Sequence, residues 1–315
     1  MKVTLDLDQL LFDKQITQQE YDKLKALAHQ SIGSLAFSLL IGFGVIAVSG
    51  AVLALVPTPS TAIFIGALVL IGGIALLKTG LIQWQVLAQI CILIGALMLG
   101  GGILIVDNGN PRSFIAIAGI YTIAAIFAQS ALLTTLAVLS IGPIVGASSG
   151  YAHAMYMIAV EEPLLTIMVF SGLGVGFYWL SKQLPLVTMI PLVYSHLAII
   201  AARTCLFMVN LGFWVGSLWG DKFNAHAANP MVVPAESFAI VWAVALIATG
   251  IWAWQQNRRW VLNIVAIFGG IHFYTQWFEH LRASPGSVLM AGIMALIFAL
   301  LLKHMNTLMT KVTKP

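Results

Sequence analysis

The chain has 315 residues, of which 60% are hydrophobic and only 8% charged, and its formal net charge is +4. A soluble domain carries about 25% charged residues, and a soluble protein of this length could not bury so much apolar surface in a core. A nucleic-acid-binding protein is not expected either, because no basic stripe or cluster is present. The composition predicts an all-α, polytopic helical bundle embedded in a membrane.

Residues 1–31 are polar and charged, and they predict a small cytosolic helical hairpin. Thr17 and Glu20 have the spacing of a capping box, so a helix is expected from Gln18 to His29. The apolar residues 10–12 predict a preceding helical turn. A cleavable signal peptide is not expected, because its apolar core is missing here.

Beyond residue 31 the chain alternates between apolar stretches of about 20 residues and short polar breaks, a pattern typical of membrane-spanning helices. About ten spans are expected, at residues 32–56, 61–78, 84–106, 113–130, 132–152, 163–181, 187–212, 236–255, 260–278 and 286–303. The turn between the fourth and fifth spans is placed at Gln129–Ser130, with Ser140–Pro143 as the alternative. Residues 304–315 form a short cytosolic tail.

The basic residues agree with this topology when the N-terminus is placed inside. Of the 15 Lys and Arg residues, 11 then lie on the cytoplasmic side, and Arg203 lies within a span. The outer side holds Arg112, Lys222 and Arg282. This asymmetry follows the positive-inside rule and predicts a bacterial inner-membrane protein with both termini in the cytoplasm.

Acidic residues show the opposite distribution. All those beyond the N-terminal segment are expected on the outer side: Asp107, Glu161, Glu162, Asp221, Glu236 and Glu279. Because acidic residues have little weight in topology rules but are common in loops, a solvated outer surface explains this distribution, with cation binding as the alternative.

Arg203 is the most conspicuous candidate for a functional residue, because an ionised group within a span costs about 2.5 kcal/mol or more at the bilayer centre and usually has a partner. It lies near the outer interface if its helix follows directly on Lys182, and deeper if Pro191 starts the helix late. Glu161 and Glu162 are its nearest expected partners in sequence. Acids before Pro163 also have a purely structural explanation, because helix N-termini favour them.

His196, Asn210 and His272 are the other candidates for a substrate or ion pathway, since each is a polar side chain on a largely apolar segment. A lone membrane histidine more often hydrogen-bonds a neighbouring helix than ligates or catalyses. Metal and cofactor sites are not expected, and Cys91 and Cys205 are interpreted as packed thiols.

Two glycine patterns suggest close helix packing. Gly142, Gly146 and Gly150 repeat every four residues and would make one smooth helix face. Residues 172, 174 and 176 are also glycines and would either break the sixth span, as in transporters, or simply pack closely. Hydrolase, zinc-protease and phosphate-loop motifs are not found, so an enzyme is not favoured.

The stretch from Leu10 to Leu27, LLFDKQITQQEYDKLKAL, resembles the opening of a bacterial family of predicted membrane proteins with a domain of unknown function. The closing segment with Trp260, Asn263, Tyr274 and Glu279 is similar to that of the same family. The resemblance implies a short cytosolic helical segment followed by eight to ten membrane helices, and it implies no reaction.

The ten-span layout also resembles drug-and-metabolite-type transporters, which consist of two inverted five-helix repeats. The two halves of this chain show no convincing similarity, and the cytosolic start departs from that layout. The sequence thus favours a secondary transporter or permease for a small solute or ion. The alternative is a non-enzymatic membrane scaffold or sensor, in which residues 1–31 dock a protein partner or self-associate.

Overall fold

The computed structural model describes residue 10 and residues 15–81, 84–152, 155–184, 192–223, 231–281 and 284–312. The described chain is mostly helical and divides into two compact units, residues 1–137 and 138–315, with the boundary inside helix α6. Each unit is described by itself.

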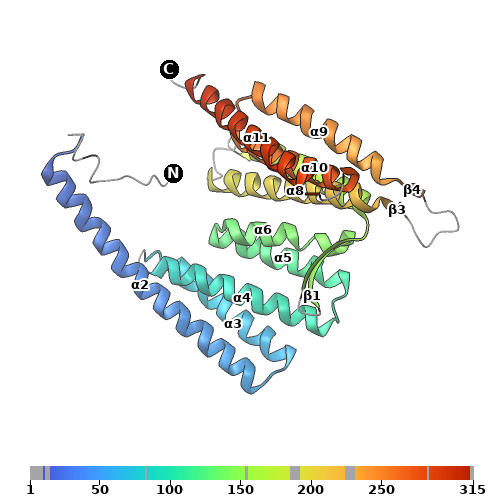
Figure 1. The fold of residues 1–315 in the computed structure, drawn as a ribbon. Helices are drawn as coiled ribbons and strands as arrows, with labels where there is room; N and C mark the ends of the chain where they lie inside the picture. The colour runs from blue at the N-terminus through green and yellow to red at the C-terminus, as the bar shows by residue number, and fades with distance from the viewer. Residues whose placement is uncertain are drawn as a thin grey trace. The chain divides into compact units, whose positions relative to one another are not determined.

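The N-terminal unit contains four long helices and the start of a short one (Figure 1). They are α2 (Gln18–Leu55), α3 (Pro59–Lys78), α4 (Gln85–Val106), α5 (Pro111–Ala128) and α6 (Ala131–Leu139). The core of this unit lies mainly between α4, α5 and α6, around Ile92, Tyr121 and Leu133.

Local sequence explains where these helices begin and end. The Thr58 side chain accepts a hydrogen bond from the Thr61 amide, and the Asn110 side chain accepts one from Arg112, which satisfies amides that have no partner within the helix. Gln129 adopts a left-handed conformation with φ 50° and ends α5, so the predicted turn at Gln129–Ser130 is confirmed.

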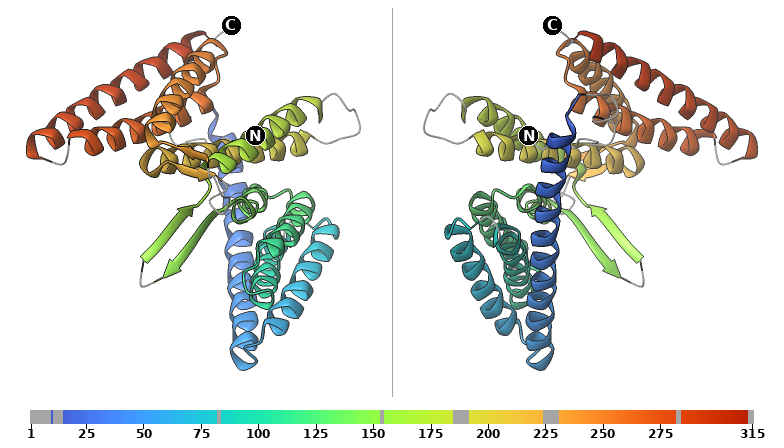
Figure 2. Two further views of the ribbon diagram at one scale, coloured as in Figure 1. Left: turned by 90° about the vertical axis from the view of Figure 1, so that its right-hand side faces the viewer. Right: turned by 90° about the vertical axis from the view of Figure 1, so that its left-hand side faces the viewer.

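The C-terminal unit contains five long helices, the end of α6, and two short hairpins (Figures 1 and 2). In chain order they are η2 (Gly142–Val145), β1 (Ala147–Ala152), β2 (Met155–Val160), α7 (Pro163–Gln183), α8 (Leu192–Trp219), β3 (Asp221–Phe223), β4 (Met231–Val233), α9 (Ala235–Gln255), α10 (Arg259–Leu281) and α11 (Pro285–Val312). Both strand pairs are antiparallel, and β1 pairs with β2 in register Ala147 to Val160.

The prediction of one helix over 132–152 is wrong. Helix α6 ends at Leu139, a 3-10 turn follows, and the chain then forms strand β1. Gly146 has φ +78° and ends the 3-10 turn, while Gly150 belongs to the strand, so the glycines do not share a helix face. The chain therefore breaks at both Gln129–Ser130 and the rival position near Ser140.

Helix α2 begins where the capping box predicted, but it does not end at His29. The Thr17 hydroxyl accepts from the Glu20 amide at 3.3 Å, and the Thr17 amide donates to Glu20 Oε2 at 2.8 Å. This bonding lowers the pKa of the Glu20 carboxyl below its ordinary value. The helix then continues to Leu55. The end of the N-terminal segment and the first predicted span therefore form one helix of 38 residues. Residues 1–9 and 11–14 of the predicted hairpin lie outside the described residues.

Three predictions for the C-terminal unit also differ from the structure. Helix α11 extends to Val312, so residues 304–312 continue the last helix instead of forming a separate tail. Helix α8 begins at Leu192, five residues later than predicted, and continues to Trp219. Helix α7 runs unbroken through its three glycines, so the broken-helix interpretation is wrong. A methyl group on Gly174 would lie 3.2 Å from Cys205 Cβ of α8, which identifies close packing as the reason for this glycine.

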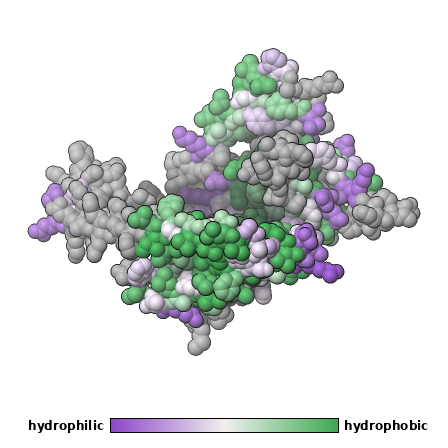
Figure 3. Space-filling view, turned by 90° about the horizontal axis from the view of Figure 1, so that it is seen from below, coloured by the Kyte–Doolittle hydropathy of each residue, from purple (hydrophilic) through white to green (hydrophobic). Residues whose placement is uncertain are grey.

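In the described part of the chain, seven helices are long and apolar enough to cross a membrane: α3, α4, α5, α7, α8, α9 and α10, the last counted to Glu279. Their outer faces are apolar. In α9, Ile240, Val244, Ile247 and Ile251 form an exposed stripe, whereas Trp242 on the opposite face is buried. Hydrophobic residues likewise cover much of the surface seen in Figure 3. Helices that are apolar on all sides fit a bilayer, and the chain is a membrane protein.

Helices α3 and α4 form the closest pair in the N-terminal unit. A methyl group added to Gly66 would lie 2.5 Å from the Leu99 nitrogen, and one added to Gly73 would lie 2.8 Å from the Ile92 nitrogen. On α4, a methyl group added to Gly95 would lie 2.7 Å from the Gly66 carbonyl oxygen. The two backbones therefore touch directly, as small residues allow in membrane helices.

This contact predicts opposite effects for two glycines of α3. Gly66→Ala should lower the free energy of unfolding by roughly 1–3 kcal/mol, because the backbones must separate. Gly72→Ala adds a methyl group that meets nothing within 4 Å, and it should be neutral or stabilising by up to about 1 kcal/mol through helix propensity. Unfolding in mixed micelles, followed by circular dichroism, measures both. Equal effects for the two variants would contradict the packing argument.

Candidate functional site

Polar side chains from three helices meet inside the C-terminal unit, and we call them the polar junction. Its members are Asn210 and Trp214 of α8, Trp242 of α9, and His272 and Thr275 of α10, and we include Gln276, which is four residues after His272 on the same face of α10. The junction forms because α10 packs one face against both α8 and α9, as the helical spacing of residues 268, 272, 275 and 276 allows.

Trp242 lies at the centre of the junction and is 1% exposed. Its Nε1 donates a hydrogen bond of 3.0 Å to Asn210 Oδ1. The Asn210 Nδ2 in turn donates to the Leu206 carbonyl at 2.8 Å, which fixes the amide. Phe213 stacks on the indole with 6.4 Å between ring centroids. Trp242 and Asn210 therefore hold α8 and α9 together through a buried polar contact.

His272 packs edge-on against Trp242, with 4.9 Å between ring centroids and an interplanar angle of 75°. Its Nδ1 atom is buried and has no hydrogen-bond partner among the described residues, and the same holds for Gln276 Nε2. These residues are four apart on one helix and share a face. A buried polar atom without a partner costs roughly 1–3 kcal/mol, so this face has capacity to bind a polar group.

A second contact joins α8 to α10 at the same level. Trp214 Nε1 donates to Thr275 Oγ1 at 3.1 Å, and that hydroxyl donates to the Ile271 carbonyl at 2.7 Å. Asn210 and His272 each lie nine residues from the end of their helix, about 14 Å along the axis. If these helix ends lie at the edge of a hydrocarbon core of about 30 Å, both residues are near its middle.

The structure thus brings together two of the predicted candidates, Asn210 and His272, through Trp242. The sequence reasoning missed Trp242. A signal was available, because Trp242 lies seven residues into α9, deeper than an interfacial belt, and an indole N–H at that depth needs a partner.

Arg203 lies away from the junction. Because α8 begins directly after Pro191, Arg203 lies 11 residues into the helix, about 17 Å along its axis, which matches the late-start alternative. Its Cζ atom lies 4.7 Å from the centre of the Trp260 ring of α10. Its Nε atom is buried and lacks a hydrogen-bond partner within the described chain.

The pairing of Arg203 with Glu161 or Glu162 is not formed. Both glutamates precede α7, whose start is held at the end of α8 by a hydrogen bond from the Leu164 amide to Asp221 Oδ2 at 2.7 Å. Arg203 lies 16 residues before that end of α8, about 24 Å away along the helix. The acid that caps α7 is therefore Asp221, 57 residues distant in sequence from Leu164, and the Glu162 side chain makes no capping bond.

His196 lies in the first turns of α8 and is exposed, so it is separate from the junction. Among the described residues, no three His, Cys, Asp or Glu side chains are grouped so that they could hold a metal ion. Comparisons with protein-family models, curated proteins and solved structures found no match to this chain. The candidate site is therefore assigned from the geometry of its residues alone.

Removing the indole N–H should measure the central contact of the junction. Trp242→Phe keeps a ring but loses the bond to Asn210, and it should lower the free energy of unfolding by about 1 kcal/mol, the range of interhelical hydrogen bonds in membranes. The double variant with Asn210→Leu should cost less than the two single changes added together. Trp219→Phe, at an exposed position, is the matched control. Strict additivity in unfolding titrations would show that the contact carries no energy.

Proposed function

We propose that this membrane protein is a secondary transporter or permease that passes a small polar solute or an ion through its C-terminal unit. The observation that supports this proposal is the pair of buried atoms without partners among the described residues, His272 Nδ1 beside Trp242 and Gln276 Nε2 one turn further along α10. Polar groups that face the interior of a membrane bundle commonly mark substrate or ion pathways.

The members of the polar junction would have different roles. Asn210 and Trp242 satisfy one another and hold α8 and α9 in place. His272 and Gln276 supply the free donor or acceptor positions that a solute would use, and His272 can also carry a proton. The estimated depth near mid-bilayer agrees with where transporters bind their solutes.

The topology is part of this proposal. Ten crossings of a bacterial inner membrane, with both termini in the cytoplasm, distribute the basic residues as the positive-inside rule requires. Seven of the crossings correspond to the seven long helices. The other three would use the shorter apolar stretches Leu40–Leu55, Pro285–Leu300 and Ala131–Val145, the last of which is α6 followed by the 3-10 turn instead of the single helix first predicted. The bacterial membrane family that the N-terminal segment resembles would have the same layout.

Flux measurements on purified protein in liposomes test the transport function. Entrapped pyranine reports proton flux under an imposed potential, and labelled amino acids, sugars, carboxylates, Na⁺ and K⁺ form the solute panel. For a transported solute, His272→Ala and Gln276→Leu should each lower the initial rate about tenfold, since each removes a hydrogen bond to the solute in a dry site. His196→Ala, which changes an exposed histidine of α8, should leave the rate unchanged.

Two results would contradict this proposal in different ways. If liposomes that contain the wild-type protein show the same flux as empty liposomes for every probe, the chain is not a transporter of these solutes. If flux is present but His272→Ala and Gln276→Leu behave like His196→Ala, the polar junction is not its binding centre.

The second candidate function is a membrane scaffold or sensor, and the observation that favours it is the unbroken helix α2. A partner that turns or tilts the cytosolic end of this helix, near Thr17, would also move the part of the same helix that enters the membrane. Residues 1–31 would provide the docking segment, for a protein partner or for a second copy of this chain.

Truncation tests the second candidate. Deletion of residues 1–31 should abolish partner crosslinks in intact cells, or convert a dimer to a monomer in detergent, without changing solute flux. Glu20→Ala, which removes the side chain that accepts from the Thr17 amide but keeps the segment, should reduce crosslinking only partly. Unchanged crosslinks and unchanged mass after truncation would exclude a docking role for this segment.

A further inference from the structure

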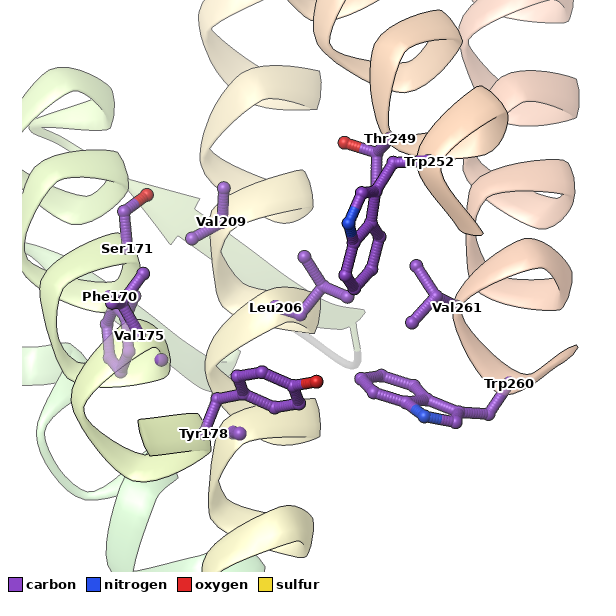
Figure 4. A pocket seen from close by; sticks show the side chains of 12 residues that line it. Phe170, Ser171, Val175, Tyr178, Leu206, Val209, Thr249, Trp252, Trp260 and Val261 are labelled. Atoms are coloured by element: carbon purple, nitrogen blue, oxygen red, sulfur yellow. The ribbon is translucent and has the colours of Figure 1, made fainter. Parts of the chain in front are cut away.

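A groove of about 300 Å³ lies among α7, α8, α9 and α10, and we call it the aromatic groove (Figure 4). Its walls are almost entirely apolar and include Phe170, Val175, Tyr178, Leu206, Trp252 and Trp260. Figure 4 shows the Tyr178 hydroxyl pointing across the groove toward Trp260. The groove opens on the surface of these helices, because Val175 is 70% exposed and Trp252 is 42% exposed.

The aromatic groove lies toward one end of these four helices. Tyr178 lies five residues before the end of α7, Trp252 three residues before the end of α9, and Trp260 is the second residue of α10. Trp and Tyr side chains at the ends of membrane helices lie at the headgroup level of the bilayer. The deeper walls, around Phe170 and Val209, then lie beside the acyl chains.

Two positively charged side chains lie over aromatic rings that line the groove. Lys182 Nζ lies 5.7 Å from the centre of the Tyr178 ring, and Arg203 Cζ lies 4.7 Å from that of Trp260. The Arg203 Nε atom has no hydrogen-bond partner in the described part of the chain. A guanidinium group stacked on an aromatic ring keeps its edge available for a phosphate.

The charge around the groove has one sign. Arg258 and Arg259 lie at the turn between α9 and α10, at the same end as Lys182. The described acidic residues of this unit lie at the opposite end: Glu161 and Glu162 before α7, Asp221 after α8, Glu236 in the first turn of α9 and Glu279 near the end of α10. An anionic ligand is therefore favoured, and a cationic one is not.

We propose that the aromatic groove binds an anionic phospholipid of the surrounding membrane. One acyl chain fills the apolar groove, and the phosphate lies beside Arg203 on Trp260, with Lys182 further toward the end of α7. Apolar walls open to the bilayer select a lipid chain over a water-soluble solute, and the basic side chains Lys182 and Arg203 select a negative headgroup. This site is separate from the polar junction and does not depend on the proposed transport function.

Native mass spectrometry of the full chain in detergent tests the proposal with two lipids of identical acyl chains, phosphatidylglycerol and phosphatidylcholine. The wild type should bind phosphatidylglycerol at least about fivefold more tightly, the effect expected of one basic side chain near a lipid surface. The double variant Lys182→Gln/Arg203→Gln should lose this preference. The matched control Arg112→Gln/Lys222→Gln removes two exposed positive charges at residues that do not line the groove, and it should retain this preference.

A second pair of variants tests the groove itself. Val175→Trp adds bulk at an exposed wall position and should lower phosphatidylglycerol binding at least about fivefold. Met168→Trp makes a similar change at a residue of the same helix that is 63% exposed but does not line the groove, and it should have no effect. Because both positions are exposed, circular dichroism and gel filtration should match the wild type.

Three outcomes would overturn the proposal. In the first, the two lipids bind equally to the wild type. In the second, the charge variants lose phosphatidylglycerol while Val175→Trp still binds it. The headgroup would then bind near the two cations, but the acyl chain would not lie in the groove. In the third, glycerol phosphate in excess displaces the lipid completely, which would identify a phosphate site that needs no acyl chain.

Discussion

Hydrocarbon cannot hydrogen-bond to a protein, and this constraint determines most of what holds the chain together. Within each long helix the backbone satisfies itself. Between helices the hydrophobic effect contributes little, because lipid is as apolar as leucine, so polar contacts and close packing must supply the specificity. The bond from Trp242 to Asn210, the bond from Trp214 to Thr275, and the backbone contact of Gly66 with α4 are of these two kinds.

The sequence predicted the helices well where a local signal marks their ends. The predicted spans begin within two residues of α3, α4, α5, α7, α9, α10 and α11, and the Thr17 capping box marks the first residue of α2. The prediction was wrong over 132–152 because this stretch is uncharged and uniformly apolar, so hydropathy could not distinguish a helix from a 3-10 turn followed by a strand. A glycine every fourth residue resembles a packing face, but Gly146 instead supplies a left-handed turn.

The candidate site was only partly predictable because its contacts are non-local. Asn210 and His272 stand out as polar residues in apolar segments, but nothing in the sequence indicates that Trp242 joins them. Likewise, sequence proximity suggested Glu161 or Glu162 as the partner of Arg203. Both glutamates lie near the C-terminal end of α8, and Arg203 is about 24 Å from that end along the helix axis. The actual neighbour of Arg203, Trp260, is an uncharged ring that charge pairing alone would not identify.

The glycine contact between α3 and α4 also has a consequence for biogenesis. Glycine has no side chain to shield its peptide groups, so α3 alone in a bilayer would expose bare backbone at Gly66 and Gly73 to acyl chains. Only residues 79–84 separate the two helices, so α4 can cover this backbone as soon as it leaves the translocation machinery. The pair is therefore suited to insert together, as a preassembled hairpin on which later helices can collect.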